Sequence, residues 1–218
     1  MTAELISKIE EWDYKVFLSI YKSSLSKRKK LILAAKIYSF FGNIYFWGLY
    51  WLSMVVYGYI TKDYLLLVLI TGGFIQSIIL HVLVRYKLVA RNRPFITLEK
   101  EGVSRHDDLI RENKSFPSGH VAFFLFFGII FAYFYQSWII LLVFIILDVI
   151  MAITRLILGV HFPTDVIAGF GFGILYALIY LYGTVIYWID LFYWAGHTFS
   201  PIIHYWIYFF IDQLLTWF

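Results

Sequence analysis

Residues 138–165 read WIILLVFIILDVIMAITRLILGVHFPTD, a long apolar run that gives way to a short polar break. Its first part, 138–154, holds one charged residue, Asp148. Because a helix needs roughly 20 apolar residues to cross the hydrocarbon core of a bilayer, we expect this part to span a membrane. Glycine and proline interrupt the pattern at 159–163, and a second apolar helix is expected to follow, to about residue 187. The stretch predicts two consecutive spans joined at one membrane face.

Three more apolar stretches precede this pair, at about 39–60, 64–84 and 117–135, and each is predicted to span. The tail from Trp188 is rich in aromatic residues and is interpreted as a sixth span, with a pair of interfacial helices as the alternative. Of the 218 residues, 61% are hydrophobic and only 15% are charged, whereas soluble domains carry about 25% charged residues. The expected fold class is all-α, a polytopic transmembrane helix bundle of five to six spans.

The N-terminal segment is amphipathic and too charged to span. Apolar residues recur at helical spacing across 4–21, and they are Leu5, Ile9, Trp12, Val16 and Ile20. We expect a helix that lies in the membrane interface, followed by the basic run 27–30. The chain is interpreted as a single membrane domain, 1–218, with an amphipathic and basic N-terminal segment (1–30), a helical core (38–187) and an aromatic C-terminal segment (188–218).

The only long polar stretch, residues 85–114, follows the second predicted span. Backbone this polar does not lie bare in lipid, so we expect an extramembrane loop. The span count places the end of the second span, the start of the third and the turn between the fourth and fifth on one membrane face. Three sequence blocks with unusual polar residues should therefore meet there: KLVARNRP (87–94), SFPSGH (115–120) and TRLILGVHFPTD (154–165).

Positive charge dominates these three blocks. They contain four cations, Lys87, Arg91, Arg93 and Arg155, and one carboxylate, Asp165. Charged groups are costly at a membrane boundary and need partners or a function, and guanidinium groups match phosphate oxygens in bidentate geometry. The blocks therefore predict a site for an anion such as phosphate. For Arg91 an anchoring contact with lipid headgroups is an equal alternative.

Residues 117–120, Pro-Ser-Gly-His, mark the start of the third predicted span. The free backbone N–H groups and the dipole of a helix N-terminus attract phosphate. Proline is tolerated in a first helical turn, and Gly119 lets the backbone approach a ligand closely. The segment thus predicts a phosphate cradle.

Two histidines and a carboxylate supply reactive groups beside this cradle. Asp165 follows His161 by four residues, so both side chains lie on one face if a helix begins near Phe162. The carboxylate can then accept one ring N–H and leave the other nitrogen free to attack phosphorus. His120 would protonate the leaving alkoxide and then activate water. These residues predict phosphoryl transfer through a phosphohistidine, with His161 as the nucleophile.

The blocks resemble the type 2 phosphatidic acid phosphatase superfamily, which has a three-part sequence pattern. The pattern reads Lys-x6-Arg-Pro, then Pro-Ser-Gly-His, then Ser-Arg-x5-His-x3-Asp. The second part matches fully at 117–120. The third part matches except at its first residue, where Thr154 replaces serine, and its matching residues are Arg155, His161 and Asp165.

The first part of the pattern matches at Arg93 and Pro94 but departs at its start. Tyr86 occupies the lysine position, and Lys87 comes one residue later. From its flexible stem, Lys87 is still expected to reach the phosphate. The resemblance covers roughly residues 38–182.

The resemblance implies a metal-independent lipid phosphatase with a helical-bundle core and without a cofactor or metal site. It implies His161 as nucleophile, His120 as acid and base, and a set of phosphate-binding residues, namely Arg93, Arg155, Ser118 and Gly119. The expected partners are a lipid phosphate and the bilayer, with no nucleic acid. Substrates of the phosphatidate, phosphatidylglycerophosphate and polyprenyl diphosphate classes all fit, and the oligomeric state stays open.

Two other functions fit the same residues. A lipid phosphotransferase would pass the phosphoryl group of the phosphohistidine to an alcohol instead of water. A non-catalytic membrane binding or scaffold protein would use a degenerate version of the fold, and the displaced Lys87 is its only support. The intact histidines and Asp165 argue against this last alternative.

The charge pattern also predicts a membrane side. Under the span count, Lys62 is the only Lys or Arg on the face opposite the three blocks, although the chain contains 18 such residues. Cytosolic faces carry the excess of lysine and arginine, so the site is predicted to face the cytosol. Setting aside the four cations of the blocks still leaves a large excess, which includes the run 27–30.

Overall fold

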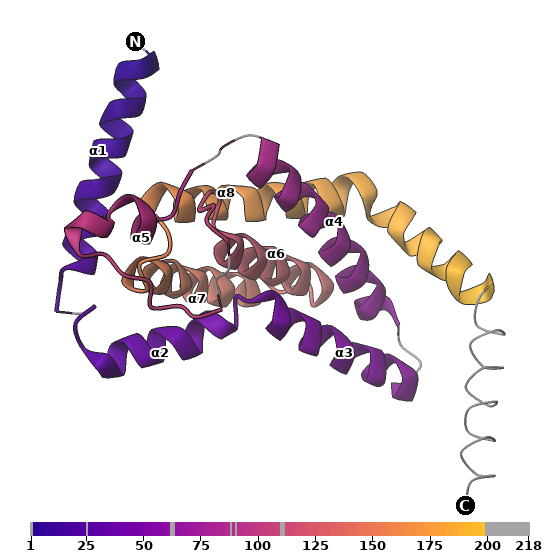
Figure 1. Ribbon diagram of the computed structural model, residues 1–218. Coiled ribbons are helices and arrows are strands. Elements are labelled where there is room, and N and C mark those ends of the chain that lie inside the picture. Colours follow the sequence, from indigo (N-terminus) through magenta and orange to yellow (C-terminus); the bar gives the residue numbers. More distant parts are fainter. Residues whose placement is uncertain are drawn as a thin grey trace, which may run out of the picture.

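The computed structural model describes residues 2–24, 26–61, 64–87, 89, 91–109 and 112–198 (Figure 1). In chain order its helices are α1 (Thr2–Tyr21), α2 (Lys29–Phe40), α3 (Ile44–Thr61), α4 (Leu65–Lys87), α5 (Pro94–Thr97), the 3-10 helix η1 (Glu99–Glu101), α6 (Gly119–Phe134), α7 (Trp138–Ile157), α8 (Pro163–Leu178) and the π-helical segment η2 (Ile179–Thr184). The described residues contain no β-strand apart from an isolated bridge between Asn92 and Lys114. The predicted all-α class is confirmed.

Helix α6 lies at the centre of the bundle and packs against α7, α8 and α4 (Figure 1). It is apolar on all sides and buries most of its side chains, as expected for a central helix. On α8, Gly169 and Gly173 face α6, and a Cβ atom at Gly173 would lie only 2.7 Å from the carbonyl oxygen of Ala122. Small residues four apart allow membrane helices to approach closely. This packing brings the start of α8 beside the start of α6, where the N–H of Ser118 donates to the carbonyl oxygen of Asp165 at 2.9 Å.

Within the part of the chain that the structure describes, three helices are long and apolar enough to cross a membrane, and they cover Leu65–Lys87, Trp138–Ile157 and Pro163–Thr198. They correspond to the second, fourth and fifth predicted spans. Helix α6 is equally apolar but shorter. Because these helices also expose many large apolar side chains, the chain is an integral membrane protein.

The first predicted span is interrupted near its start. We expected it to run from about Ser39, but α2 ends at Phe40 and α3 begins only at Ile44. Asn43 explains the new start, because its Oδ1 accepts the backbone N–H of Tyr45 at 3.0 Å and so caps α3. The hydrophobic pattern alone did not reveal this cap.

The C-terminal helix is longer than expected. It begins as α8, passes through η2 and continues to Thr198. It therefore runs past Trp188, where the sequence suggested the start of a separate segment. Residues 199–218 lie outside the described residues, so a sixth span stays a prediction.

Helix α1 forms where the amphipathic pattern predicts it, and its N-terminal end projects from the bundle (Figure 1). Its first turns expose Leu5, Ile9 and Trp12, whereas Asp13 and Phe17 are fully buried. Exposed apolar side chains on a charged helix suit a lipid interface, and this interfacial placement stays a prediction. The second half of α1 docks against the bundle.

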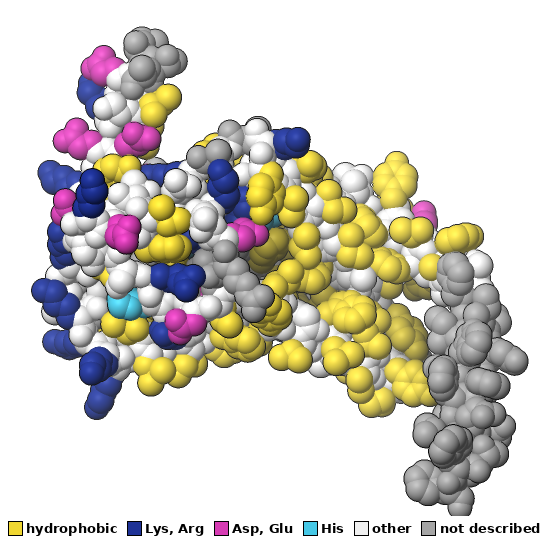
Figure 2. All heavy atoms as spheres, viewed as in Figure 1, with side chains coloured by type: hydrophobic (Ala, Val, Ile, Leu, Met, Phe, Trp, Pro, Cys, Tyr) yellow, Lys and Arg dark blue, Asp and Glu magenta, His cyan; other side chains and the backbone are white. Residues whose placement is uncertain are grey.

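Charged and apolar surfaces occupy different parts of the molecule. Lys and Arg side chains gather at the end formed by α1, α2 and α5, whereas hydrophobic side chains cover much of α3, α4 and α8 (Figure 2). Such a division places the apolar part in lipid and the basic end at the membrane–water boundary. The starts of α5 and α8 lie at this basic end (Figure 1).

Candidate active site

The turn between α7 and α8 presents His161, and Gly159 shapes that turn. Gly159 has a φ of +75°, in the left-handed region that commonly ends a helix. A Cβ atom there would lie 2.6 Å from the carbonyl oxygen of Ser104, so glycine also lets the polar loop cross closely. Helix α8 then begins at Pro163, a favoured first residue. His161 is left between the two helix ends with only 1% of its surface exposed.

A cavity of about 280 Å³ lies at this end of the bundle, and all three sequence blocks contribute to its wall. The first block supplies Arg93, the second supplies Gly119 and His120, and the third supplies His161. The other lining residues come from the start of α3, from α4, from the polar loop and from α6, and they are Gly42, Asn43, Ile44, Tyr45, His81, Arg85, Leu109, Glu112 and Phe123. The structure thus brings the blocks together at one face.

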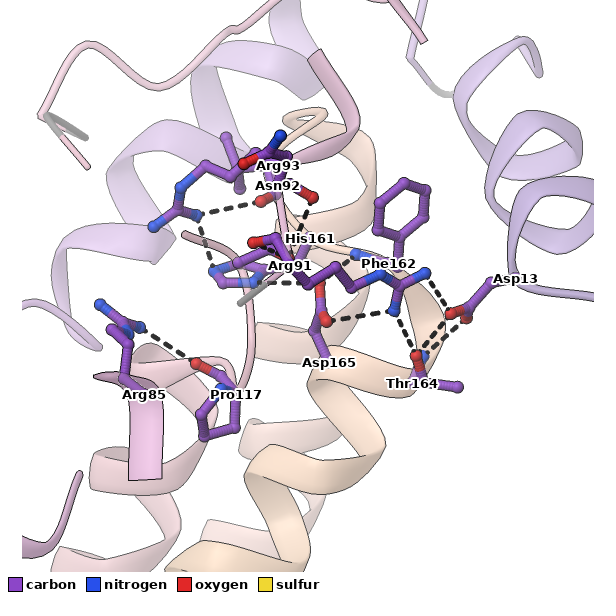
Figure 3. Close-up of polar contacts among 12 residues, drawn as sticks. Asp13, Arg85, Arg91, Asn92, Arg93, Pro117, His161, Phe162, Thr164 and Asp165 are labelled. Carbon is purple, nitrogen blue, oxygen red and sulfur yellow. Dashed lines mark hydrogen bonds and ion pairs between the residues drawn. The ribbon is translucent and has the colours of Figure 1, made fainter. Parts of the chain in front are cut away.

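The position of the proton on the His161 ring follows from its neighbours. Nε2 lies 3.1 Å from Nη1 of Arg93 (Figure 3). A guanidinium group only donates hydrogen bonds, so Nε2 must be the acceptor and carries the lone pair. The ring proton is therefore on Nδ1, which lies 3.6 Å from Oδ2 of Asp165. Burial and the charge of Arg93 hold the pKa of His161 well below its usual 6.5, so the ring is neutral at neutral pH.

Asp165 is fully buried in the first turn of α8. Its Oδ2 accepts the backbone N–H of Phe162 at 2.8 Å, which closes the turn that carries His161. Its Oδ1 lies 3.3 Å from Nη1 of Arg91. The carboxylate therefore has fixed partners on both oxygens, and Oδ2 is the oxygen that faces the histidine ring.

Arg93 immediately precedes α5, and two carbonyl oxygens accept hydrogen bonds from its side chain. Its Nε donates to the carbonyl oxygen of Glu112 at 2.7 Å, and its Nη1 donates to the carbonyl oxygen of Val160 at 3.0 Å. Burial, reinforced by nearby arginine charges, lowers the pKa of Arg93 to about 9. The side chain still carries its positive charge at neutral pH, and Nη1 lies beside Nε2 of His161.

Arg155 lies wholly buried near the end of α7. Its Nη1 donates to Oδ2 of Asp107 at 2.8 Å and to the hydroxyl of Ser39. Its Nε and Nη2 are buried without a hydrogen-bond partner in the protein. One edge of the guanidinium group is thus anchored, and the other edge has no protein partner. Arg155 is not among the residues that line the cavity, and it lies behind its wall.

The start of α6 contributes Gly119 and His120 to the cavity wall. Ser118 precedes the first helical residue, Gly119, and the Ser118 hydroxyl is buried without a protein partner. A Cβ atom at Gly119 would lie 3.1 Å from Nε2 of His81, so a larger residue would crowd the cavity. His120 follows in the first turn, and its Nε2 is also buried without a partner.

Most buried side-chain nitrogen and oxygen atoms without a partner in the described residues belong to this site. They are Nε2 of His81, Nε of Arg85, Oγ of Ser118, Nε2 of His120, Nε and Nη2 of Arg155 and Nδ1 of His161. Buried polar groups are normally hydrogen-bonded, because an unpaired one is costly. Nδ1 of His161 faces Asp165. Since most of the other atoms are N–H or O–H donors, they suit an anion with several oxygen atoms.

Lys87 and Arg85, near the end of α4, differ in their position relative to the cavity. Lys87, predicted to bind phosphate, is exposed at the end of α4 and does not line the cavity. Arg85 does line it, and its Nη1 donates to Oε2 of Glu112 at 2.6 Å. Its Nη2 donates to the carbonyl oxygen of Pro117 at 3.0 Å (Figure 3). Residues two apart on a helix point in nearly opposite directions, so α4 cannot turn both side chains to the cavity.

His81 is a second site residue that the motifs do not include. It lies one helical turn before Arg85 on α4, and both line the cavity. Its ring is 5% exposed and contacts the ring of Phe123 at a centroid distance of 5.0 Å. The spacing of four between His81 and Arg85 was the available signal in the sequence.

The remaining cation of the blocks, Arg91, forms ion pairs with two carboxylates of the protein. It does not line the cavity. It pairs with Asp13 of α1 at 2.6 Å and with Asp165 at 3.3 Å (Figure 3). Within the described residues, no three His, Cys, Asp or Glu side chains are grouped so that they could hold a metal ion.

Comparison with known proteins agrees with these motifs. Residues 62–188 match the family model described as the PAP2 superfamily. The crystal structure of Aquifex aeolicus LpxE is 19% identical, has a TM-score of 0.63 and covers 78% of this chain and 94% of its own. That of the first transmembrane PAP2 type phosphatidylglycerolphosphate phosphatase from Bacillus subtilis is 17% identical, has a TM-score of 0.63 and covers 79% of this chain and 84% of its own. At these identities the two structures show a shared fold. No curated protein sequence matches the chain.

Proposed function

Since this chain belongs to the PAP2 superfamily, we propose that it is a membrane-bound phosphatase that hydrolyses the phosphomonoester or diphosphate groups of lipids. The observation that carries the proposal is the state of the His161 ring. It is neutral, it holds its lone pair on Nε2, and Arg93 and Arg155 supply positive charge close by. A nucleophilic nitrogen surrounded by donors is what phosphoryl transfer requires.

The proposed reaction has two steps. Nε2 of His161 attacks phosphorus, the P–O bond to the lipid breaks, and His120 gives a proton to the leaving oxygen. His120 then takes a proton from water, whose oxygen attacks phosphorus and breaks the P–N bond of the phosphohistidine. Phosphate leaves, and both histidines return to their starting forms.

The cations and the start of α6 would hold the phosphoryl oxygens during both steps. Arg93 would pass its N–H from His161 to a phosphate oxygen, which frees the lone pair for attack. Arg155 offers its free Nε and Nη2, and Ser118 and Gly119 offer hydroxyl and backbone N–H groups. Arg85 would take the place of the lysine that the sequence pattern lacks.

The position of the cavity supports a lipid substrate. It lies at the basic end of the molecule, next to the apolar surface of α3 and α4 (Figure 2). Two of its lining residues, Ile44 and Tyr45, are 48% and 60% exposed and belong to the start of α3. A substrate could therefore keep its tails in the bilayer while its phosphate enters the site. The Bacillus subtilis structure, a phosphatidylglycerolphosphate phosphatase by its description, is compatible with this substrate class.

Phosphate release from detergent-solubilised protein tests the proposal. With EDTA present, we expect release from phosphatidate, phosphatidylglycerophosphate or a polyprenyl diphosphate, because His161 and the arginines supply the nucleophile and the charge that a metal ion would otherwise provide. Activity that disappears in EDTA and returns with Mg²⁺ would contradict the metal-independent mechanism. Analysis of the products in the presence of an acceptor alcohol would reveal a phosphotransferase.

The basic end is further proposed to face the cytosol, following the excess of Lys and Arg there (Figure 2). The chain has no cysteine, so a single introduced thiol can be labelled without background. Ser104 is exposed in the polar loop at this end. We expect Ser104→Cys to resist a membrane-impermeant thiol reagent in intact cells and to react after permeabilisation. Labelling in intact cells would place the site on the opposite face.

A further inference from the structure

Asp13 is a fully buried carboxylate on a helix whose neighbouring acids, Glu10 and Glu11, are exposed. It points into the start of α8 (Figure 3). Its Oδ1 accepts the backbone N–H of Thr164 at 2.9 Å, and its Oδ2 accepts the Thr164 hydroxyl and, at 2.6 Å, Nη2 of Arg91. A buried carboxylate is costly unless it is paired and hydrogen-bonded. Both conditions are met, so α1 is anchored at this point.

Arg91 connects Asp13 to Asp165, because its guanidinium group donates hydrogen bonds to both carboxylates. Its Nη1 donates to Oδ1 of Asp165 at 3.3 Å and to the Thr164 hydroxyl at 2.6 Å. Its guanidinium carbon lies 4.0 Å from the ring centroid of Phe162, a cation–π contact that fixes the plane of the group. Because a guanidinium group is rigid and planar, its two ends hold the two carboxylates in a fixed relation.

This arrangement determines how Asp165 faces His161. With Oδ1 held by Arg91, Oδ2 is left for the N–H of Phe162 and for Nδ1 of His161. We propose that Asp13 is a positioning residue, which acts through Arg91 to keep Asp165 oriented so that the ring proton of His161 stays on Nδ1. The inference rests on the proposed function of His161. It assigns the amphipathic N-terminal helix a part in the reaction, although that helix lies outside the matched residues 62–188.

The cavity wall contains neither Asp13 nor Arg91 nor Thr164. A change at Asp13 should therefore leave the binding of the substrate phosphate intact. It should slow the chemical step, because a misoriented Asp165 no longer fixes the tautomer of His161. The expected signature is a loss in kcat without a matching rise in KM.

Asp13→Asn should lower kcat for phosphate release by about 10- to 100-fold, the range found for outer-shell residues that orient the ligands of metal sites. KM should change by less than about twofold. The assay uses the full chain in detergent, with whichever lipid phosphate the wild type hydrolyses best. Glu11→Gln is the matched control, because it removes the same charge from an exposed position on α1, and it should retain wild-type kinetics. An unchanged kcat in Asp13→Asn would overturn the inference.

The double variant Asp13→Asn with Asp165→Asn shows whether Asp13 positions Asp165 or only stabilises the fold. If Asp13 acts through Asp165, adding Asp13→Asn to Asp165→Asn should cause no further loss, because residues that act as one unit are not additive. If Asp13 merely stabilises the bundle, the two losses should multiply. Multiplication would count against the proposed role.

Thr164→Val provides a second test if Asp13→Asn fails to fold. Valine has nearly the shape of threonine but lacks the hydroxyl that joins Asp13 and Arg91. We expect a several-fold lower kcat with KM unchanged. A variant with normal kcat would show that the link does not act on the reaction.

Ring nitrogen chemical shifts distinguish failure of this inference from failure of the proposed function. A wild type that releases no phosphate from any lipid phosphate would sink the proposed function. In that case the ¹⁵N shifts of His161 would still test the role of Asp13, because they report the tautomer without any measurement of activity. They should show the proton on Nδ1 in the wild type and a mixture of tautomers in Asp13→Asn. Identical spectra for the two proteins would refute the inference.

Discussion

His161→Ala should lower phosphate release from lipid phosphates by about five to six orders of magnitude, the scale seen when the nucleophile of a hydrolase is removed. The reason is that Nε2 of His161 is the atom proposed to bond to phosphorus. The chain contains no cysteine that could replace it. Initial rates of phosphate release in detergent, with EDTA present, measure the effect.

The matched control is His197→Ala. His197 is exposed near the end of the C-terminal helix and does not line the cavity of His161. The His197→Ala variant should keep wild-type activity. This result would show that the loss in His161→Ala does not come from removing just any histidine. His161→Ala should also elute from size exclusion as the wild type does. Substantial turnover by a well-folded His161→Ala protein would rule out the proposed nucleophile.

The pH dependence of kcat/KM provides a second test of the protonation state of His161. The reactive form of His161 is neutral, and its pKa lies well below 6.5 because of burial and the neighbouring arginines. A lowered pKa means that the proton is bound only in more acidic solution. For the wild type, kcat/KM should therefore not fall through protonation of His161 until the pH is below 6.5. A loss of activity with a midpoint above 6.5 that is traced to this ring by its ¹⁵N shifts would contradict the assignment.

The sequence was sufficient to predict that the three blocks meet. Apolar runs near Leu65, Trp138 and Pro163 are long enough to identify spans, and alternating spans force their ends to one face or the other. His120 and His161 could therefore be placed together without knowledge of side-chain contacts. The spacing of four between His161 and Asp165 also predicted their proximity, which the structure shows at 3.6 Å.

The sequence was less informative where contacts join distant segments. Asp13 and Thr164 are far apart in the chain, and α1 reads as an ordinary amphipathic helix whichever residue is buried. Asp107 is one of several acids in a polar loop, and only the folded chain shows that it pairs with Arg155. Lys87 does not line the cavity, although the sequence suggested that it would reach the phosphate. The direction of a side chain on α4 depends on the rotation of the helix, and the uniformly apolar sequence of α4 does not specify that rotation.

Arg155→Lys should lower kcat/KM by about three orders of magnitude while leaving the fold intact. Arg155 is the buried cation whose Nε and Nη2 remain free for the phosphoryl oxygens. An arginine that stabilises the transition state of phosphoryl transfer contributes about 10³- to 10⁵-fold. Lysine keeps the charge but cannot make the bidentate contact while it also holds Asp107. Arg105→Lys, in the exposed loop, is the control and should behave as the wild type.

Arg155→Met tests whether the loss comes from catalysis or from stability. Removing the cation leaves Asp107, which is only 6% exposed, without its partner at 2.8 Å, and breaking a buried pair in this way costs about 3–5 kcal/mol. The double variant Arg155→Met with Asp107→Asn removes that unpaired charge, so it should regain most of the thermal stability in detergent. It should not regain activity, because the guanidinium group of Arg155 is missing from the phosphate site. Recovery of phosphate release together with stability would show that Arg155 supports the fold and not the reaction.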